Sequence, residues 1–181
     1  MDFDGSLINS FGPEEGKLMW EKYYNKIFQF SGWWGRPESL DLDVFDIKPF
    51  PSVFNQLKRE QSIPGTYVVI LTSRIEELRP QVQAVLDANE IVVDKLDMKK
   101  IETTKGNKVL GYVEQMPDLQ EICVYEDRDT DIQSYKTIKN QIPKNIIYNI
   151  YLAVNGKLSL LEIDNKLLKV ITEEIQDFMK N

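Results

Sequence analysis

The stretch Tyr67-Val68-Val69-Ile70-Leu71-Thr72-Ser73-Arg74, residues 67 to 74, decides the fold that we expect of this chain. Its first five residues are apolar, and Pro64-Gly65 marks a turn just before them. A continuous apolar run of this length suits a strand that is buried on both faces of a parallel sheet. The polar residues Thr72-Ser73-Arg74 then lie at the carboxyl end of that strand.

A second apolar run, Glu121-Ile122-Cys123-Val124-Tyr125, ends in the polar residues Glu126-Asp127-Arg128. Shorter segments around the two runs have helical or strand character. The expected helices cover 51–59, 75–88 (with Pro80 as a disturbance), 109–116 and 131–139, and short strands are expected at 1–3 and 91–93. Strands and helices therefore alternate, which predicts an α/β fold with a parallel sheet flanked by helices.

Residues 8–50 interrupt this alternation, because they are dense in Pro, Gly and aromatic residues. Helical character covers 14–30, and an aromatic-rich loop follows at 31–37. We expect a lid or flap inserted after the first strand. Its tryptophans could stack on nucleic-acid bases or could form the small core of the lid.

The last part of the chain predicts a β-hairpin and a helix. Asn155-Gly156 separates the runs 146–154 and 157–163, and this dipeptide favours the type I′ turn of a hairpin. The final helix is expected over 165–179. We predict that these elements add an edge to the sheet and pack against it.

Composition bounds the chemistry. A chain of 181 residues suits a single domain over 1–181, and no apolar run approaches the length of about 20 residues that crosses a bilayer. The single cysteine, Cys123, favours a reducing, cytoplasmic location. The net charge of -7 means that a polyanion would need a local basic patch. The chain has no histidine, which excludes histidine triads and histidine-ligated zinc. We expect no membrane association and no obligate protein partner.

Four segments place polar residues where strands are expected to end: Asp2 with Asp4, Thr72 with Arg74, Lys105 or Lys108, and Glu126 with Asp127. Functional groups gather at the carboxyl ends of strands in an open parallel sheet. Paired carboxylates can hold Mg²⁺, which prefers oxygen ligands and keeps waters for a substrate phosphate. A carboxylate can also attack phosphorus, and a nearby lysine would offset the crowded negative charge.

These segments resemble the motifs of the haloacid-dehalogenase (HAD) superfamily. Asp2-Phe3-Asp4-Gly5-Ser6-Leu7 is similar to its first motif, Val69 to Arg74 to its second, and Tyr125-Glu126-Asp127-Arg128 to its acidic fourth. Thr103 to Lys108 can supply the lysine of the third motif. The resemblance covers about residues 1 to 140, in the family's order.

A closer resemblance is to the HAD domain of Swiss Army Knife RNA repair proteins, a group related to polynucleotide 3′-phosphatases. The stretch from Gly32 to Leu40, with its two tryptophans, resembles the tryptophan-rich insert of that group. Asp131 stands where the group tends to place a histidine. The first strand of the family also has several apolar residues before its aspartate, whereas only Met1 precedes Asp2, so we expect a shortened first strand.

The resemblance implies a Rossmann-like (HAD-like) sheet and a Mg²⁺-dependent phosphohydrolase. Asp2 would attack phosphorus and form an aspartyl-phosphate, and Asp4 would protonate the leaving oxygen and later activate water. Thr72 would bind the phosphoryl oxygens. Lys108 would steady Asp2 and the phosphate, with Lys105 as the alternative lysine.

The resemblance also implies the metal ligands and the substrate. Mg²⁺ would be held by the acidic residues of the first and fourth motifs: Asp2, Asp4, Asp127 and Glu126. The candidate substrate-binding residues are Ser73, Arg74, Arg128, Trp33 and Trp34. Alternatively, Thr72 or Ser73 could cap the following helix, and each arginine could pair with a carboxylate. The implied substrate is a nucleic-acid 3′-phosphate end or a nucleotide, and the alternatives are a small-metabolite phosphatase or a catalytically inactive HAD-like binding module.

Overall fold

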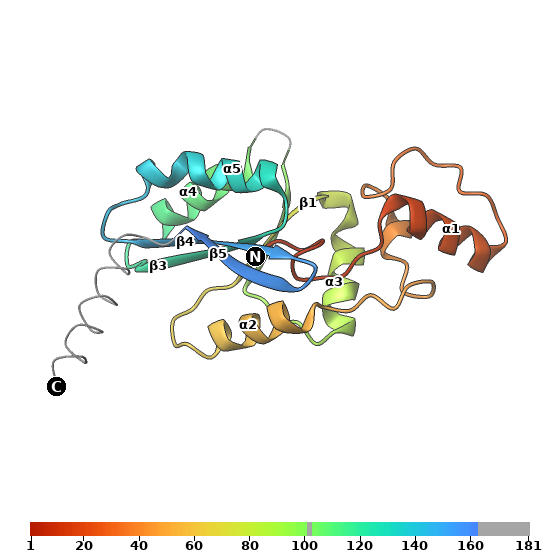
Figure 1. Ribbon diagram of the computed structural model, residues 1–181, viewed down its shortest axis with the longest axis horizontal. Coiled ribbons are helices and arrows are strands. Elements are labelled where there is room, and N and C mark those ends of the chain that lie inside the picture. The colour runs from red at the N-terminus through yellow and green to blue at the C-terminus, as the bar shows by residue number, and fades with distance from the viewer. Residues whose placement is uncertain (101–102, 163–181) are drawn as a thin grey trace. The chain divides into compact units, whose positions relative to one another are not determined.

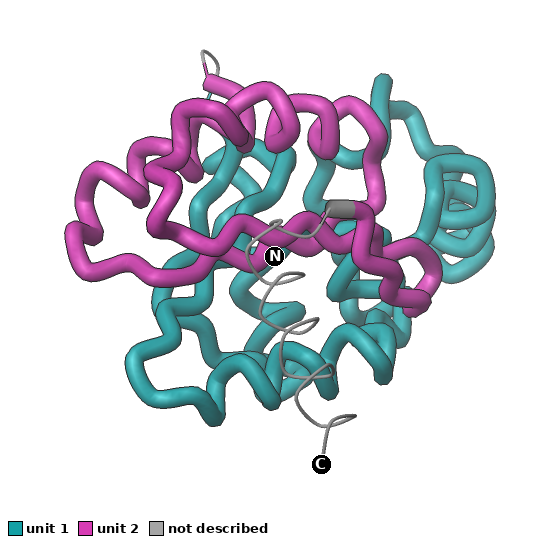
Figure 2. Tube along the Cα trace, turned by 60° about the vertical axis from the view of Figure 1, so that its left-hand side comes forward, with its two compact units in different colours: residues 1–101 teal, residues 102–181 magenta. Residues whose placement is uncertain are grey.

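The computed structural model describes residues 1–100 and 103–162. The chain divides into two compact units, Met1–Ile101 and Glu102–Asn181 (Figure 2). Both units contain strands and helices (Figure 1), which confirms the α/β class. The helix expected over 165–179 lies outside the described residues. In the described part of the chain, no helix combines the length and the apolar character needed to cross a membrane.

The first unit contains a β-α-β arrangement around the deciding stretch. Strand β1 (Val69–Ile75) pairs in parallel with β2 (Lys95–Lys99), and η2 (Glu76–Leu78) and α3 (Arg79–Ala88) connect them. The expected strand and helix are therefore confirmed. Pro80 was expected to disturb the helix, and it does not. It lies in the first turn of α3, where a missing N–H costs no hydrogen bond.

Strand β2 begins later than expected, so the prediction of a strand at 91–93 is wrong. Leu96 and Met98 are buried and alternate with the exposed Lys95 and Lys99. This period of two is the mark of a strand with one covered face. The backbone hydrogen bonds of Val68 explain the start, because its carbonyl oxygen accepts the N–H of residues 94 and 95.

The chain between the first segment and β1 contains three helical elements: α1 (Pro13–Tyr24) and η1 (Pro37–Leu40) within the expected insert of 8–50, and α2 (Pro51–Gln61) after it. Helix α1 ends at Asn25, whose φ of 51° is left-handed, so the helix is shorter than the expected 14–30. Helix α2 begins at its expected residue and buries Val53 and Leu57. Gly16 of α1 lies so close to the Trp33 ring that a Cβ would overlap the ring.

The second unit contains a second β-α-β arrangement: α4 (Lys105–Gln115), β3 (Glu121–Glu126), α5 (Asp129–Ile138), η3 (Lys139–Gln141), β4 (Ile147–Val154) and β5 (Lys157–Glu162). Strands β3 and β4 are parallel, and β5 is antiparallel to β4. Asn155 and Gly156 have φ angles of 49° and 75°, which confirms the expected hairpin turn. Helices α4 and α5 cover one face of this sheet (Figure 1).

The core of the second unit joins these helices to the sheet. Val109 of α4, Ile132 and Tyr135 of α5, and Tyr148 and Ile150 of β4 belong to one buried cluster. Helix α4 begins four residues before the expected start. The cause is a cap at Thr104, whose side-chain oxygen accepts the N–H of residue 107 at 3.2 Å.

Candidate active site

The first segment of the chain lies beside β1. The terminal ammonium of Met1 donates to the carbonyl oxygen of Val69, and the N–H of Leu71 donates to the carbonyl oxygen of Met1, both at 2.9 Å. The chain then turns at Gly5, whose φ is 75°. Residues 1–3 do not form the expected strand, but they hydrogen-bond to the amino-terminal half of β1, and the segment brings Asp4 to Arg74 near the carboxyl end of that strand. The side chain of Asp2 is buried.

Arg74 joins the first and second motif segments. Its guanidinium binds Asp4 in a bidentate ion pair, with both N–O distances at 2.8 Å. Its third nitrogen donates to the Ser39 hydroxyl at 2.7 Å and to the carbonyl oxygen of Trp34 at 3.0 Å. The Arg74 side chain is only 1% exposed. These contacts are all within the protein. Arg74 was expected either to bind substrate or to pair with a carboxylate, and the structure contains the carboxylate pair.

Thr72 and Ser73 differ in their exposure. Thr72 is buried, and its hydroxyl oxygen accepts the N–H of Arg74 at 3.1 Å. Ser73, one residue later on the strand, points the other way and is exposed. Thr72 and Asp4 therefore both contact Arg74, Thr72 at its backbone N–H and Asp4 at its guanidinium.

The two tryptophans of the insert have separate positions. Trp33 is 2% exposed, its ring nitrogen donates to the carbonyl oxygen of Phe11 at 2.8 Å, and its ring meets those of Phe28 and Phe45. Trp33 is therefore part of the core of the insert. Trp34 is 42% exposed, and its ring lies over the Arg74 guanidinium at 5.4 Å.

The third and fourth motif segments meet in the second unit. The Lys105 ammonium lies 2.7 Å from an oxygen of Glu126 and 3.1 Å from an oxygen of Asp131. The other oxygen of Glu126 accepts the N–H groups of Asp127 and Arg128. Lys105 begins α4 and Glu126 ends β3, so the helix start and the strand end bring them together.

The burial of Glu126 perturbs its titration. Loss of water around the carboxyl raises its pKa to about 7, against the opposing effect of the Lys105 charge and hydrogen bond. A hydrogen bond with the Asp127 side chain and the nearby negative charge of Asp131 act in the same direction as the burial and raise the pKa of Glu126 further. Perturbed carboxyls of this kind are concentrated at functional sites, although structural ion-pair networks also contain them.

Arg128 and Asp127 follow Glu126 directly and contact this ion-pair network, Arg128 through Asp131 and Asp127 through a side-chain hydrogen bond with Glu126. Lys108 is one turn further along α4 and is half-buried. Arg128 is exposed, with its nearest nitrogen 3.9 Å from Asp131. Asp127 is half-buried directly after β3. Sequence spacing favoured Lys108, whereas the contacts place Lys105 at the end of the strand.

Asp131 contacts Lys105 in the ion-pair network of the second unit, and Ser39 binds Arg74 in the first unit. The sequence did not single out either residue as a site residue. Asp131 had a signal, because it stands where the related group tends to have histidine, and it contacts Lys105. Ser39 had no such signal. Its role as a partner of Arg74 depends on a contact between residues 35 positions apart.

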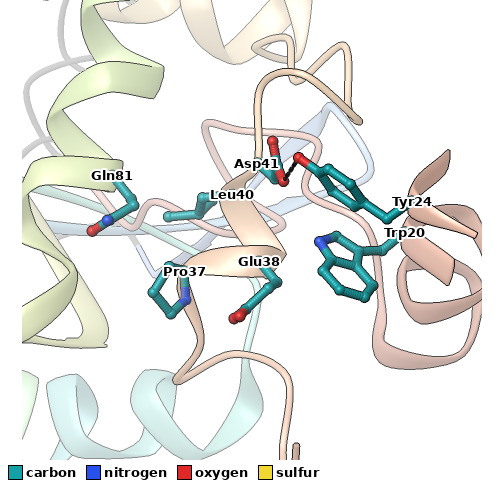
Figure 3. A pocket seen from close by; sticks show the side chains of 7 residues that line it. All are labelled: Trp20, Tyr24, Pro37, Glu38, Leu40, Asp41 and Gln81. Atoms are coloured by element: carbon teal, nitrogen blue, oxygen red, sulfur yellow. Dashed lines mark hydrogen bonds between the residues drawn. The ribbon is translucent and has the colours of Figure 1, made fainter. Parts of the chain in front are cut away.

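The insert also contains pockets. One, of about 410 Å³, is lined by Trp20 and Tyr24 of α1, by Glu38 and Asp41 at η1, and by Gln81 of α3 (Figure 3). The Tyr24 hydroxyl donates to Asp41 at 2.9 Å, which raises the pKa of Tyr24 to about 12. Two carboxylates in the lining oppose the binding of a phosphate group.

A second pocket, of about 370 Å³, has a different character. It is lined by Trp20, Lys26, Ile27, Gln29 and Phe30. Its lining includes a cation and no carboxylate, so it suits an anionic ligand better than the first pocket does.

No family model, curated protein or solved structure matches this chain. The functional argument therefore depends on the residues and contacts of the chain itself.

Proposed function

We propose that this chain is a Mg²⁺-dependent phosphohydrolase in which Asp2 is the nucleophile. One observation carries the proposal: the segment with Asp2 and Asp4 runs beside β1, with Met1 hydrogen-bonded to Val69 and Leu71 and with Asp4 paired to Arg74 near the carboxyl end of the strand. The two segments that were expected to meet at a strand end thus meet inside the first unit. Functional groups of parallel α/β proteins gather at this end of a strand.

The proposed reaction has two displacements. An oxygen of Asp2 forms a bond to phosphorus while the bond from phosphorus to the leaving oxygen breaks. The protonated form of Asp4, with one oxygen released from its pair with Arg74, supplies the proton to that oxygen. Asp4 then takes a proton from water, which attacks the acyl phosphate and releases inorganic phosphate. Thr72 binds a phosphoryl oxygen. Arg74 is a positioning residue in this scheme, because its bidentate pair holds the Asp4 carboxylate in one orientation.

The proposal also assigns roles to a lysine and to acidic residues of the third and fourth motif segments. Lys105 takes the place that spacing had assigned to Lys108, since Lys105 is the lysine held at the end of β3. Both oxygens of Glu126 already accept hydrogen bonds, so Glu126 holds Lys105 and the backbone after β3. Asp127, Asp2 and the backbone of Asp4 are the proposed Mg²⁺ ligands. Carboxylate and carbonyl oxygens are the donors that Mg²⁺ prefers, and the ion would offset the phosphate charge.

The proposal also assigns the chain the Rossmann-like fold of the HAD superfamily. Two parallel β-α-β arrangements, β1 to β2 and β3 to β4, support this assignment. The order of the four motif segments along the chain supports it as well.

The test measures hydrolysis of p-nitrophenyl phosphate with Mg²⁺ and with a chelator. The chelator and Asp2→Asn should each abolish turnover, whereas Asp118→Asn, an exposed carboxylate of the second unit, should not. Asp4→Asn leaves water poorly activated, so mass spectrometry after acid quenching should find more phosphate adduct on Asp2 than in the parent chain.

Asp4→Asn also leaves the buried Arg74 with a weaker partner, so circular dichroism must first show that this variant is folded. The parent chain carries the decisive outcome. If it is folded and supplied with Mg²⁺ but neither turns over nor forms the adduct, the chain is an inactive binding module.

A further inference from the structure

The pocket of Figure 3 lies among three elements of the first unit, α1, η1 and α3. Element η1 contacts both helices, so the walls of the pocket come from parts of the chain that pack together. Its volume of about 410 Å³ is within the range of small-molecule sites. The residues that line it are Trp20 and Tyr24 of α1, Gln81 of α3, and Pro37, Glu38, Leu40 and Asp41 at η1.

The two carboxylates of this lining have no positive partner. Neither Glu38 nor Asp41 forms an ion pair with any residue that the structure describes. The basic residue nearest to Glu38 along the chain is Arg36, and it is directed elsewhere. Its Nε donates to the carbonyl oxygen of Ser31 at 3.3 Å, and its guanidinium lies over the Phe30 ring. The negative charge of the pocket is therefore not balanced by its own walls.

The lining also has an excess of hydrogen-bond acceptors. Three of its polar atoms are covered by protein and have no hydrogen-bond partner within the described part of the chain: Trp20 Nε1, Glu38 Oε2 and Gln81 Oε1. Such atoms are rare because each one costs free energy of folding. Two of the three are acceptors, and the donor of Tyr24 is already used by Asp41 at 2.9 Å. The pocket thus suits a ligand that brings N–H donors.

Aromatic rings form the wall on the α1 side. The ring centres of Trp20 and Tyr24 are 4.8 Å apart, and Figure 3 shows both rings on the same side of the pocket. Phe28 supports Trp20 from behind in an edge-to-face contact at 5.6 Å. The face of such a ring attracts a cation within about 6 Å. Mg²⁺ gives up its waters reluctantly, so a wall of this kind favours an organic cation over a metal ion.

We propose that this pocket binds a small aliphatic diamine in its doubly protonated form. Its ammonium groups donate to Glu38, Asp41 and Gln81, and its methylene chain packs against Trp20 and Leu40. Two carboxylates match two ammonium groups, and hydrogen bonds between such charged groups are the strong ones. A lysine side chain has the same chemistry but one ammonium group, so it would leave one carboxylate unpaired. The inference goes beyond the proposed hydrolysis, in which none of the lining residues has a role.

Isothermal titration calorimetry of the full chain with 1,4-diaminobutane tests the proposal, in a buffer that contains neither amines nor Mg²⁺. The parent chain should bind the diamine, and added salt should weaken binding. 1,4-Butanediol has the same length but no charge and should not bind. The fully methylated diamine keeps both charges but has no N–H donor, so it should bind more weakly than the parent diamine. MgCl₂ should compete no better than NaCl of the same ionic strength.

Two substitutions test the two kinds of wall. Glu38→Gln keeps the shape and removes the charge, and it should weaken binding by about 10-fold to 150-fold, the range for a hydrogen bond to a charged group. Trp20→Leu should weaken binding by about 2-fold to 30-fold, the range for one cation–π contact. Glu77→Gln makes the same exchange at an exposed carboxylate of the first unit and should bind like the parent chain. Urea unfolding first establishes that each variant is folded.

Four outcomes overturn the inference: no binding by the folded parent chain, equal binding of the diol, parent-like binding by folded Glu38→Gln, or an equal loss in Glu77→Gln. Tighter binding of Nα-acetyl-lysine methylamide than of the diamine would identify a lysine side chain as the occupant and would also overturn it. Hydrolysis of p-nitrophenyl phosphate without diamine binding refutes this inference alone. Diamine binding without hydrolysis refutes the proposed function alone.

Discussion

Glu126 shows how burial can set the behaviour of a single residue. Its carboxyl is fully covered and touches Lys105, yet its pKa is raised to about 7 because the loss of water outweighs the attraction of the lysine. A carboxyl with this environment changes charge near neutral pH. Its contribution to stability should therefore change over the same range.

We expect the stability of the second unit to fall as the pH rises from about 5 to 7. The folded chain keeps the Glu126 proton up to about pH 7, whereas the unfolded chain loses it near the ordinary pKa of 4.5. The folded state binds more protons in this window, so the free energy of unfolding falls by up to about 1.4 kcal/mol per pH unit. Urea unfolding with chelator present should show this loss in the parent chain relative to Glu126→Gln.

Glu114→Gln, at an exposed position of α4, controls for the removal of one negative charge. A difference between parent and Glu126→Gln that is constant from pH 5 to 7, or that grows in favour of the parent, would contradict the prediction.

Two glycines of α4 illustrate how packing decides the effect of one substitution within an element. A Cβ on Gly106 would overlap the backbone carbonyl oxygen of Ser134 in α5, and the Gly106 N–H also donates to the Ser134 hydroxyl. Gly111 has nothing closer than a Gln115 side-chain nitrogen at 4.0 Å. At Gly106 the backbones of the two helices are therefore close enough to exclude a Cβ, whereas at Gly111 there is room for one.

Alanine should have opposite effects at these two positions. Gly106→Ala forces α4 away from α5 and should lower the free energy of unfolding by about 1–3 kcal/mol, as overpacking does. Gly111→Ala lowers the backbone entropy of the unfolded chain and should raise it by about 0.5–1 kcal/mol. Urea denaturation of both variants provides the comparison. Equal effects of the two substitutions would mean that α4 and α5 do not pack closely at Gly106.

At the scale of the whole molecule, the proposed function includes a Mg²⁺ ion with Asp2 and Asp127 among its ligands. An ion that binds only the folded chain raises its stability, by about 2.7 kcal/mol at a concentration of 100 times Kd. We therefore expect Mg²⁺ to raise the Tm of the parent chain. Asp2→Asn in the first unit and Asp127→Asn in the second should each remove that increase.

Asp118→Asn again serves as the exposed control and should retain the increase. Calorimetry without substrate measures this effect independently of turnover. Loss of the increase in only one of the two variants would remove the other residue from the proposed Mg²⁺ ligands.

The sequence by itself determined the features that depend on neighbouring residues. The apolar run at β1, the Asn155-Gly156 turn and the polar residues after β3 were all predictable, because strand burial and turn geometry act over a few residues. The same local reasoning failed at β2, whose alternation of buried and exposed residues begins at Lys95 and whose start depends on the pairing with Val68.

The tertiary structure decided which polar residues meet. Arg74 pairs with Asp4 across 70 positions of sequence, and Lys105 rather than Lys108 contacts Glu126 across 21. Trp33 is buried while its neighbour Trp34 is exposed. Spacing along the chain cannot make these choices, because burial and ion pairing depend on which side chains the folded backbone brings within a few ångströms of one another.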